Sequence, residues 1–385
     1  MFLKNFLGIT REAALRISIV GGSNSVMRRG YAKYIGNYLE KTTLRPADLK
    51  YYSLGGVPSI HGVIQQERYN IADNSDIIFF EYCVNDRHAI ESEQYSLELA
   101  GKSLEGFIKK VQRSNPKCII IILIFGINLD TFYNNRCFLS ELYQTVGSYY
   151  DVPVIDITKL LGKEGLNSVK SLYHDRDHAH YTRPEGVQIV AEVIVEELQK
   201  YRMIEILKNR GKQRKPKNIQ PIYPDNFENL SFIENFGEAD YFLAPPKVSV
   251  YRNTVFKERN LTIERGNALR FRLKGKLLAI YIKSDCNDGF VAIEFNSQKL
   301  VTSSYSSWVN RIKPQNVLNL IALPLRRFSA SQDFAPVSIS VCQEYPQDFE
   351  LGFNKTVPTK QNPHQWKLSI VGVAYTGEIK KIESD

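Results

Sequence analysis

Three of the six histidines in this 385-residue chain lie within one short stretch, HDRDHAHYTRPEG, at residues 174–186. Histidines and aspartates gathered in this way can hold a metal ion, form the base of a serine-nucleophile site, or lie in a solvated loop. Two overlapping Asp-x-x-His pairs occur in the stretch. The first is Asp175 with His178, and the second is Asp177 with His180. In either pair, a carboxylate three residues before the imidazole can hold one ring nitrogen while the other faces a nucleophile.

The spacing of the three histidines does not favour a metal site. His174 and His178 are four positions apart, and His178 and His180 are two positions apart. A helix would have to bring the first two together, but the helix signal in this region begins only at Thr182, after all three. No second group of ligands clearly converges on them from elsewhere in the sequence. The stretch therefore favours the base of a nucleophilic site, and we expect no metal ion.

The helix that follows the histidines has a clear start signal. Thr182 and Glu185 form an S/T-x-x-E capping box, and Pro184 is tolerated in the first turn. An apolar stripe at helical spacing follows, made of Val187, Val190, Ala191, Ile194 and Leu198. We favour the second Asp-x-x-His pair, because its histidine leads directly into this helix. The first pair stays open.

Strand signals alternate with helical ones over the first 200 residues. The strand segments are short apolar runs at 15–22, 49–56, 75–86, 117–126 and 152–158. Apolar residues recur at helical spacing between 27 and 38 and again between 97 and 111. Strands that alternate with helices predict an α/β fold, with a parallel sheet covered by helices on both faces.

Polar residues and glycines follow three of these strands. Ser23 comes after two glycines that end the first strand, Gly56 ends the second, and Asn85 ends the third. Because ligands bind at the carboxyl ends of parallel strands, we expect these residues to meet the histidine stretch at one edge of the sheet. The N–H groups of Ser23 and Gly56 and the side-chain amide of Asn85 can donate to the oxyanion of a serine reaction. Each residue taken alone is equally typical of a turn or a helix cap.

Four sequence blocks in this order resemble the motifs of the SGNH (GDSL-type) hydrolase family. They are IVGGSNS (19–25), SLGGVPS (53–59), EYCVND (81–86) and DHAHYT (177–182). The resemblance covers about residues 15–200 and implies a flavodoxin-like α/β/α sandwich. It also implies that Ser23 is the nucleophile and that Gly56 and Asn85 complete the oxyanion hole. The Asp-x-x-His pair would then activate the serine.

Two positions depart from the family pattern. Gly22 stands where the family usually has aspartate, and Cys83 stands where the third block usually has glycine. Neither is a catalytic position of the pattern, so we expect a different subfamily rather than a loss of activity. They leave open the alternative of a catalytically inactive protein that binds a carbohydrate or a partner on the same scaffold.

The second half of the chain has the pattern of an all-β domain. Alternating β-type segments separated by turn residues extend from about 223 to 385 and predict a sandwich or jelly roll. A basic linker at 206–222 joins this domain to a catalytic domain at 1–205. We regard the β domain as a candidate for binding carbohydrate or a partner. Five aromatic residues could form a sugar-stacking platform, although we expect each to pack in the core: Trp308, Trp366, Tyr251, Tyr281 and Tyr305.

Composition and charge argue against several classes of protein. Six Lys and Arg residues of the linker account for +6 of the formal net charge of +9, so we expect no nucleic-acid partner. The linker remains a candidate for contact with an anionic surface. The five cysteines (83, 118, 137, 286 and 342) lack the spacing of a disulfide framework or a zinc site. The N-terminus is a poor secretory signal, no apolar run reaches the length of a membrane span, and we expect a cytoplasmic protein.

These observations predict an enzyme that cleaves or transfers an O-acyl ester, with acetyl as the expected acyl group and a carbohydrate as the expected substrate. A cell-surface polysaccharide or its precursor is one such substrate. The reaction would use a Ser-His-Asp triad and an acyl-enzyme. Hydrolysis would require no cofactor, whereas a transferase would use acetyl-CoA as its donor. The sequence does not separate these two activities.

Overall fold

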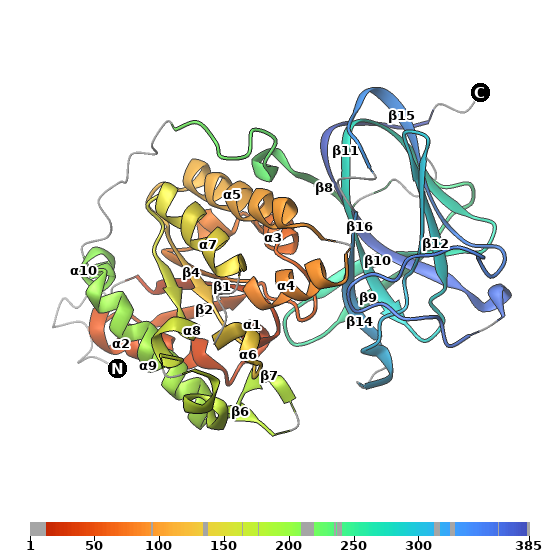
Figure 1. Ribbon diagram of the computed structural model, residues 1–385. Helices are drawn as coiled ribbons and strands as arrows, with labels where there is room; N and C mark the ends of the chain where they lie inside the picture. The colour runs from red at the N-terminus through yellow and green to blue at the C-terminus, as the bar shows by residue number, and fades with distance from the viewer. Residues whose placement is uncertain are drawn as a thin grey trace, which may run out of the picture.

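The computed structural model describes residues 13–382, except 94, 134–137, 164, 176, 209–218, 235, 237–240, 312–315, 324–327 and 361. An α/β domain occupies the first half of the chain and an all-β domain the second (Figure 1). Most of the predicted basic linker and Cys137 lie outside the described residues. Among the described residues, Cys83, Cys118, Cys286 and Cys342 form no disulfide.

A parallel sheet of five strands forms the centre of the α/β domain. The strands are β1 Leu15–Gly21, β2 Ala47–Tyr51, β3 Ile77–Glu81, β4 Ile119–Ile124 and β5 Val154–Asp156. Their order in the sheet is β2-β1-β3-β4-β5, which is the flavodoxin-like order. The predicted α/β class is confirmed. The strand predicted over 75–86 ends at Glu81, because a helix starts at Cys83 and carries the last residues of that segment.

Helices cover both faces of the sheet (Figure 1). They are α1 Ser23–Val26, α2 Tyr31–Thr43, α3 Ile60–Tyr69, α4 Cys83–Glu91, α5 Leu97–Ser114, α6 Asp130–Tyr133, α7 Phe138–Tyr149, α8 Ile157–Leu161, α9 Glu185–Lys200 and α10 Met203–Lys208. Helices α2 and α9 pack together on one face, and α3, α5 and α7 lie on the other. The sequence predicted α2, α5 and α9. It missed α3, whose buried face includes the polar residues His61, Gln65 and Gln66 and so hides the apolar periodicity.

Helix α9 begins later than the sequence predicted. Its first residue is Glu185, and Pro184, which follows a cis peptide bond, occupies the N-cap position. The hydroxyl of Thr182 accepts a hydrogen bond from the N–H of Gly186 at 3.0 Å, not from that of Glu185. The predicted capping box is therefore wrong in register. Thr182 still accepts a hydrogen bond from the first turn of the helix, but its donor is the N–H of Gly186, one residue after the predicted donor.

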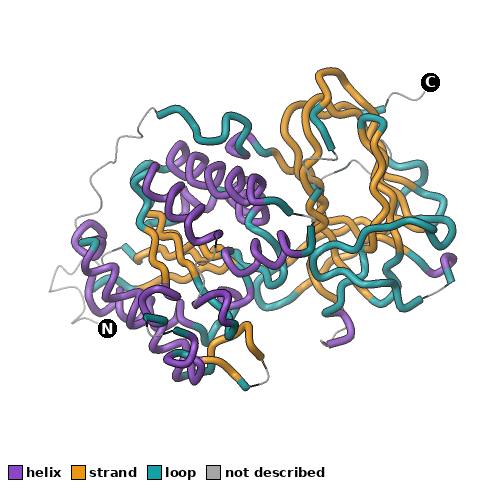
Figure 2. Tube along the Cα trace, viewed as in Figure 1, coloured by secondary structure: helices purple, strands orange, loops and turns teal. Residues whose placement is uncertain are grey.

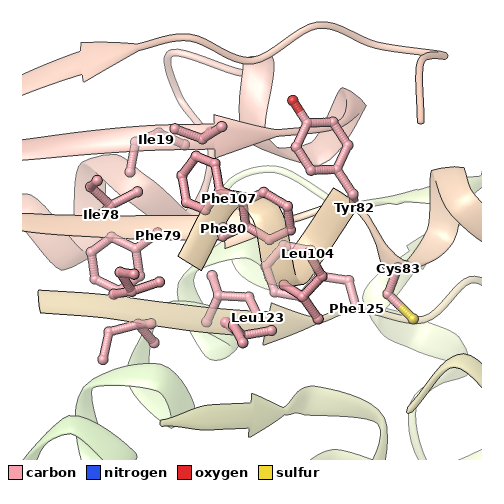
Figure 3. Packing of buried hydrophobic residues seen from close by; sticks show 14 of the residues in the cluster. Ile19, Ile78, Phe79, Phe80, Tyr82, Cys83, Leu104, Phe107, Leu123 and Phe125 are labelled. Atoms are coloured by element: carbon pink, nitrogen blue, oxygen red, sulfur yellow. The ribbon is translucent and has the colours of Figure 1, made fainter. Parts of the chain in front are cut away.

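The core of the α/β domain lies between the central strands and α5. Figure 3 shows Phe80 of β3 close to Leu104 and Phe107 of α5. The rings of Phe80 and Phe107 have centroids 4.6 Å apart. Burying each such side chain contributes roughly 1.5–3 kcal/mol to stability. This packing fixes the carboxyl ends of β1 and β3, where the candidate site residues follow.

The second domain is an antiparallel sheet, and strands dominate this half of the molecule in Figure 2. Its nine strands are β8 Ser231–Ile233, β9 Lys247–Arg252, β10 Lys257–Glu264, β11 Ala268–Asp285, β12 Phe290–Phe295, β13 Gln298–Ser303, β14 Asn316–Ala322, β15 Ser331–Val341 and β16 Lys367–Lys380. The long strand β11 replaces two shorter predicted segments. It pairs with β15 and β14 along one edge and with β16 along the other.

The two domains share a buried interface. Apolar residues on β11, β14 and β16 belong to the same hydrophobic cluster as the core of the α/β domain. At this interface, Arg68 of α3 pairs with Glu258 of β10 at 2.6 Å and with Glu234 at 2.7 Å. The side chains of Arg68 and Glu258 are only 5% and 2% exposed, so this ion pair is enclosed between the domains.

No helix among the described residues is both long enough and apolar enough to cross a membrane. The 18-residue helix α5 illustrates why, because it carries Glu98, Lys102 and Glu105 along its length.

Candidate active site

The nucleophile candidate stands at the start of a short helix. Strand β1 ends at Gly21, and Gly22 is the N-cap of α1, whose first residue is Ser23. The N–H of Gly22 donates to the backbone oxygen of Glu81 at 2.8 Å. Ser23 is partly exposed, whereas Ser25 is buried and donates its hydroxyl proton to Glu81 Oε2 at 2.9 Å. Of the two serines in this segment, Ser23 is the more exposed and is therefore the nucleophile candidate.

The buried side chain of Glu81 accepts hydrogen bonds from this segment, from the N–H of Gly22 and the hydroxyl of Ser25. Burial raises the pKa of Glu81 to about 8, although hydrogen bonds from Ser25 and Gly22 lower it in part. The carboxyl is therefore mostly protonated at neutral pH. Asp86 behaves in the same direction: burial raises its pKa to about 6, against hydrogen bonds from Tyr143 and the N–H of Ser59.

The segments that carry the candidate oxyanion donors lie next to Gly22 and Ser23. A Cβ on Gly55 would lie 3.3 Å from the Cβ of Ser23, and Gly56 has φ +71°, which favours glycine. The side chain of Asn85 donates from Nδ2 to Val57 O at 2.8 Å. A Cβ on Gly22 would lie 2.5 Å from Asn85 Oδ1. A side chain at position 22 would therefore displace the Asn85 amide from its place in this structure.

The base candidate lies on a two-stranded hairpin, formed by β6 Tyr173–His174 and β7 Asp177–Tyr181. His180 Nδ1 is 2.7 Å from Asp177 Oδ2. Burial raises the pKa of Asp177, but the hydrogen bond and charge of His180 outweigh this effect, and the pKa is lowered overall. Asp177 is therefore a carboxylate at neutral pH. With Nδ1 bound to that carboxylate, the other nitrogen of His180 remains available as a proton acceptor.

One hydrogen bond ties the two ends of the candidate site together. Asn24, directly after Ser23, donates from Nδ2 to the backbone oxygen of Ala179 at 3.1 Å. Ala179 directly precedes His180. The structure thus brings together two segments that are 155 positions apart in the chain.

The other Asp-x-x-His register has different contacts. The backbone oxygen of His178 accepts from the N–H of Asn128 at 2.8 Å. The Nδ1 atom of the His178 ring lies 3.4 Å from Asn128 Nδ2. Asp175 is exposed. No hydrogen bond or ion pair between Asp175 and His178 occurs among the described residues, which do not include residue 176.

The third histidine of the stretch, His174, lies opposite Asp177 in the hairpin. Within the described ranges, no group of three or more His, Cys, Asp or Glu side chains is arranged so that it could hold a metal ion.

The β domain reaches the edge of the candidate site. Asn354 donates from Nδ2 to the backbone oxygen of Gly56 at 2.9 Å. Trp308 Nε1 would be 3.6 Å from a Cβ on Gly56, and Trp308 is 40% exposed. The expectation of core packing is confirmed for Trp366, Tyr281 and Tyr305, which are buried, and it is wrong for Trp308. The half-buried Tyr251 packs against the shared core.

Comparison with solved structures finds the same architecture elsewhere. A two-domain esterase (CEX) active on acetylated mannans superposes with a TM-score of 0.65 at 17% identity, over 96% of this chain and 93% of that one. Its structure co-crystallised with mannopentaose gives 0.64 at 16% identity, over 95% and 92%. A lipase/acylhydrolase from Enterococcus faecalis gives 0.40 at 16% identity, over 52% of this chain and 99% of that one.

No family model matches the sequence, and no curated protein is detectably similar to it. The likeness to the mannan-active esterase extends over both domains and nearly the whole length of both chains. At this identity it concerns the fold. The chain therefore shares its two-domain architecture with that esterase, and its first domain has the α/β/α fold that the resemblance to SGNH hydrolases implies.

Proposed function

We propose that this protein is an esterase that removes O-acetyl groups from a carbohydrate. The observation that carries the proposal is the convergence around Ser23 at the carboxyl edge of the sheet. Gly55 lies against Ser23, and Asn85 lies against the preceding Gly22. The hydrogen bond from Asn24 to Ala179 brings the His180 segment next to the residue that follows Ser23. A hydroxyl, an imidazole and oxyanion donors in one place are the requirements of serine acyl chemistry.

In the first step, Ser23 Oγ attacks the carbonyl carbon of the acetyl ester, and His180 Nε2 accepts the hydroxyl proton. Asp177 holds the Nδ1–H of the ring and stabilises the imidazolium that forms. The negative charge on the carbonyl oxygen is stabilised by the N–H groups of Ser23 and Gly56 and the amide of Asn85. When the intermediate collapses, the sugar oxygen leaves with the proton from His180, and an acetyl ester remains on Ser23.

In the second step, water attacks the acetyl-enzyme while His180 accepts one of its protons. Collapse of this intermediate releases acetate and returns the proton to Ser23. A sugar hydroxyl in place of water would give acetyl transfer instead.

A carbohydrate substrate is proposed because the β domain places a partly exposed aromatic residue, Trp308, at the edge of the candidate site. Trp308 exposes part of its indole next to Gly56, and the guanidinium of Arg311 lies 5.2 Å from the centre of its ring. Exposed aromatic faces pack against the apolar faces of sugar rings. The protein of similar architecture acts on acetylated mannans, so acetylated manno-oligosaccharides are the first substrates to examine.

The test is acetate release from acetylated manno-oligosaccharides and xylo-oligosaccharides, with an aryl acetate as a small reference substrate. We expect turnover by the wild type, a loss of about 10³-fold or more in Ser23→Ala, and normal turnover in Ser148→Ala, which alters an exposed serine of α7. Activity that persists in Ser23→Ala would contradict the proposal. Faster acetyl transfer from acetyl-CoA to the deacetylated sugar than acetate release would make the protein a transferase.

The contribution of Trp308 is tested on the same substrates. In Trp308→Ala we expect KM for the acetylated oligosaccharide to rise about 10-fold, in line with the loss of one aromatic contact of about 1.4 kcal/mol. The kinetics with the aryl acetate should change by less than about twofold, because that substrate has no sugar ring to pack on the indole. Equal losses on both substrates would mean that Trp308 acts on the reaction and not on sugar binding.

A further inference from the structure

One turn of the β domain contacts both of the loops that carry candidate oxyanion donors. This turn, residues 352–355, lies between strands β15 and β16 in the sequence. Its Asn354 reaches the glycine loop after β2, and its Phe353 reaches helix α4, which follows β3. Neither contact has a counterpart in the sequence motifs, which lie entirely in the α/β domain.

The first contact fixes a glycine. Asn354 Nδ2 donates to Gly56 O at 2.9 Å, and Asn85 Nδ2 donates to Val57 O at 2.8 Å. Two successive carbonyls of this loop are therefore held by hydrogen bonds. The β domain supplies the donor to Gly56 O, and the α/β domain supplies the donor to Val57 O. Gly56 is in the left-handed region and, like Gly55, has no side chain to restrict its backbone. The hydrogen bond to Gly56 O fixes the peptide unit that follows the Gly56 Cα, and through φ and ψ of Gly56 it restricts the direction of the Gly56 N–H.

The second contact is on the helix that carries Asn85. The ring of Phe353 stacks on that of His88, with centroids 6.1 Å apart and planes 19° apart. His88 lies one turn after Asn85 on α4. The same turn of the β domain thus packs against the element that supplies the second donor.

The turn is itself rigidly held. Asn354 has φ +58°, a conformation that asparagine tolerates better than most residues. Its backbone oxygen accepts from the N–H of Ser307 at 3.1 Å, and the N–H of Lys355 donates to Gly352 O at 2.9 Å. The Lys355 side chain is buried in the β domain. The turn is thus a fixed support and not a loose loop.

From these contacts we infer that Asn354 is a positioning residue of the esterase reaction, through which the β domain holds the Gly56 N–H in place for the developing oxyanion. The inference rests on the proposed function. It assigns the β domain a part in the chemical step, in addition to any sugar binding. Because the oxyanion charge develops mainly in the transition state, the loss of this support lowers kcat and leaves KM almost unchanged.

The sharpest variant is Asn354→Asp, which keeps the size and the backbone preference but directs a carboxylate oxygen at Gly56 O. We expect kcat on the aryl acetate to fall between about 10-fold and about 100-fold, with KM within about twofold. Loss of a whole oxyanion donor costs about 10²–10³-fold, and a misdirected donor should cost less. The matched control is Asn296→Asp, since Asn296 also has a positive φ (52°) in the same domain. Its kcat should equal that of the wild type.

A second variant guards against misfolding. Asn354→Gly removes the amide and suits the left-handed backbone, so its melting temperature should stay close to that of the wild type while kcat still falls. Wild-type kcat in either Asn354 variant, or a rise in KM with kcat unchanged, would overturn the inference. An inactive wild type, or a Ser23→Ala variant as active as the wild type, would instead refute the proposed function itself.

Discussion

The two ends of the candidate site are built in opposite ways. At the nucleophile end, Gly22 and Ser25 bind the buried Glu81 beneath the sheet edge, where the carboxyl group is enclosed by the core. At the base end, Asp177 and His180 lie on a short hairpin, and their side chains are 48% and 17% exposed. The first arrangement belongs to the core, and the second is close to a surface ion pair.

This difference separates the stability of the site from its chemistry. A buried polar group that loses its partner costs about 1–3 kcal/mol, whereas an exposed ion pair contributes about 0.2–1 kcal/mol. Substitutions at the nucleophile end should therefore change the free energy of unfolding, and those at the base end should change turnover almost alone. Four variants test this contrast.

The largest effect is expected for His180→Ala. Removing the base should lower kcat by about 10³-fold or more, while the melting temperature stays within about 2 °C of that of the wild type. His178→Ala is the matched control on the same strand and should keep more than half of the activity. The reverse result, with His178→Ala inactive and His180→Ala active, would assign the reaction to the other Asp-x-x-His pair.

The next largest effect is expected for Asp177→Asn. An amide in place of the carboxylate allows the wrong tautomer of His180, and we expect kcat to fall about 10²-fold. Because Asp177 is partly solvated, water can replace part of its hydrogen bond. Asp175→Asn, two positions earlier, should change kcat by less than about twofold. Steady-state kinetics of the two variants side by side compare the two registers directly.

Glu81→Gln should change the pH dependence of stability. The folded protein holds the Glu81 proton up to about pH 8, whereas the unfolded chain releases it near 4.5, so the stability of the wild type falls as pH rises through this window. The glutamine side chain cannot ionise, so the stabilities of the variant and the wild type should be similar at pH 5 and should diverge toward pH 8, in favour of the variant. Asp86 remains in both proteins and contributes the same trend up to about pH 6.

Melting temperatures of the two proteins at pH 5, 6, 7 and 8 measure this difference. A constant offset between the two proteins across the series would contradict the raised pKa of Glu81.

The smallest effect is expected for Ser25→Ala. The hydroxyl of Ser25 lies between Glu81 and Tyr31, and its removal should lower the free energy of unfolding by about 1 kcal/mol. We expect kcat to fall by no more than about fivefold, since Ser23 remains in place. Denaturant unfolding together with kinetics measures both quantities. A loss as large as that of Ser23→Ala would mean that the two serines had been assigned the wrong way round.

Local signals in the sequence predicted one part of the molecule and not the other. The apolar runs of the central strands made the sheet visible, and the residues after β1, β2 and β3 followed from the rule that strand ends meet at one edge. Ser23 and Asn85 are visible in this way, because each directly follows an apolar run. The start of α9 was misplaced because a capping-box pattern alone does not fix the register of the first turn.

Contacts between the domains left no such signal. Asn354 lies 298 positions from Gly56, in a segment without a motif, and its role depends entirely on how the two domains pack. Trp308 resembles any other aromatic residue of a sandwich until its exposure is known. Helix α3 was missed because it buries polar side chains: His61 contacts Tyr82 and Gln65 within the α/β domain, whereas Arg68 pairs with Glu258 of the β domain.

The most direct test of the account is the site of covalent modification by a fluorophosphonate, read by intact mass and peptide mapping. The account predicts one adduct per chain, located on Ser23, that forms far more slowly in His180→Ala and at the normal rate in His178→Ala. An adduct on any other residue, or labelling of Ser23→Ala at the rate of the wild type, would contradict it.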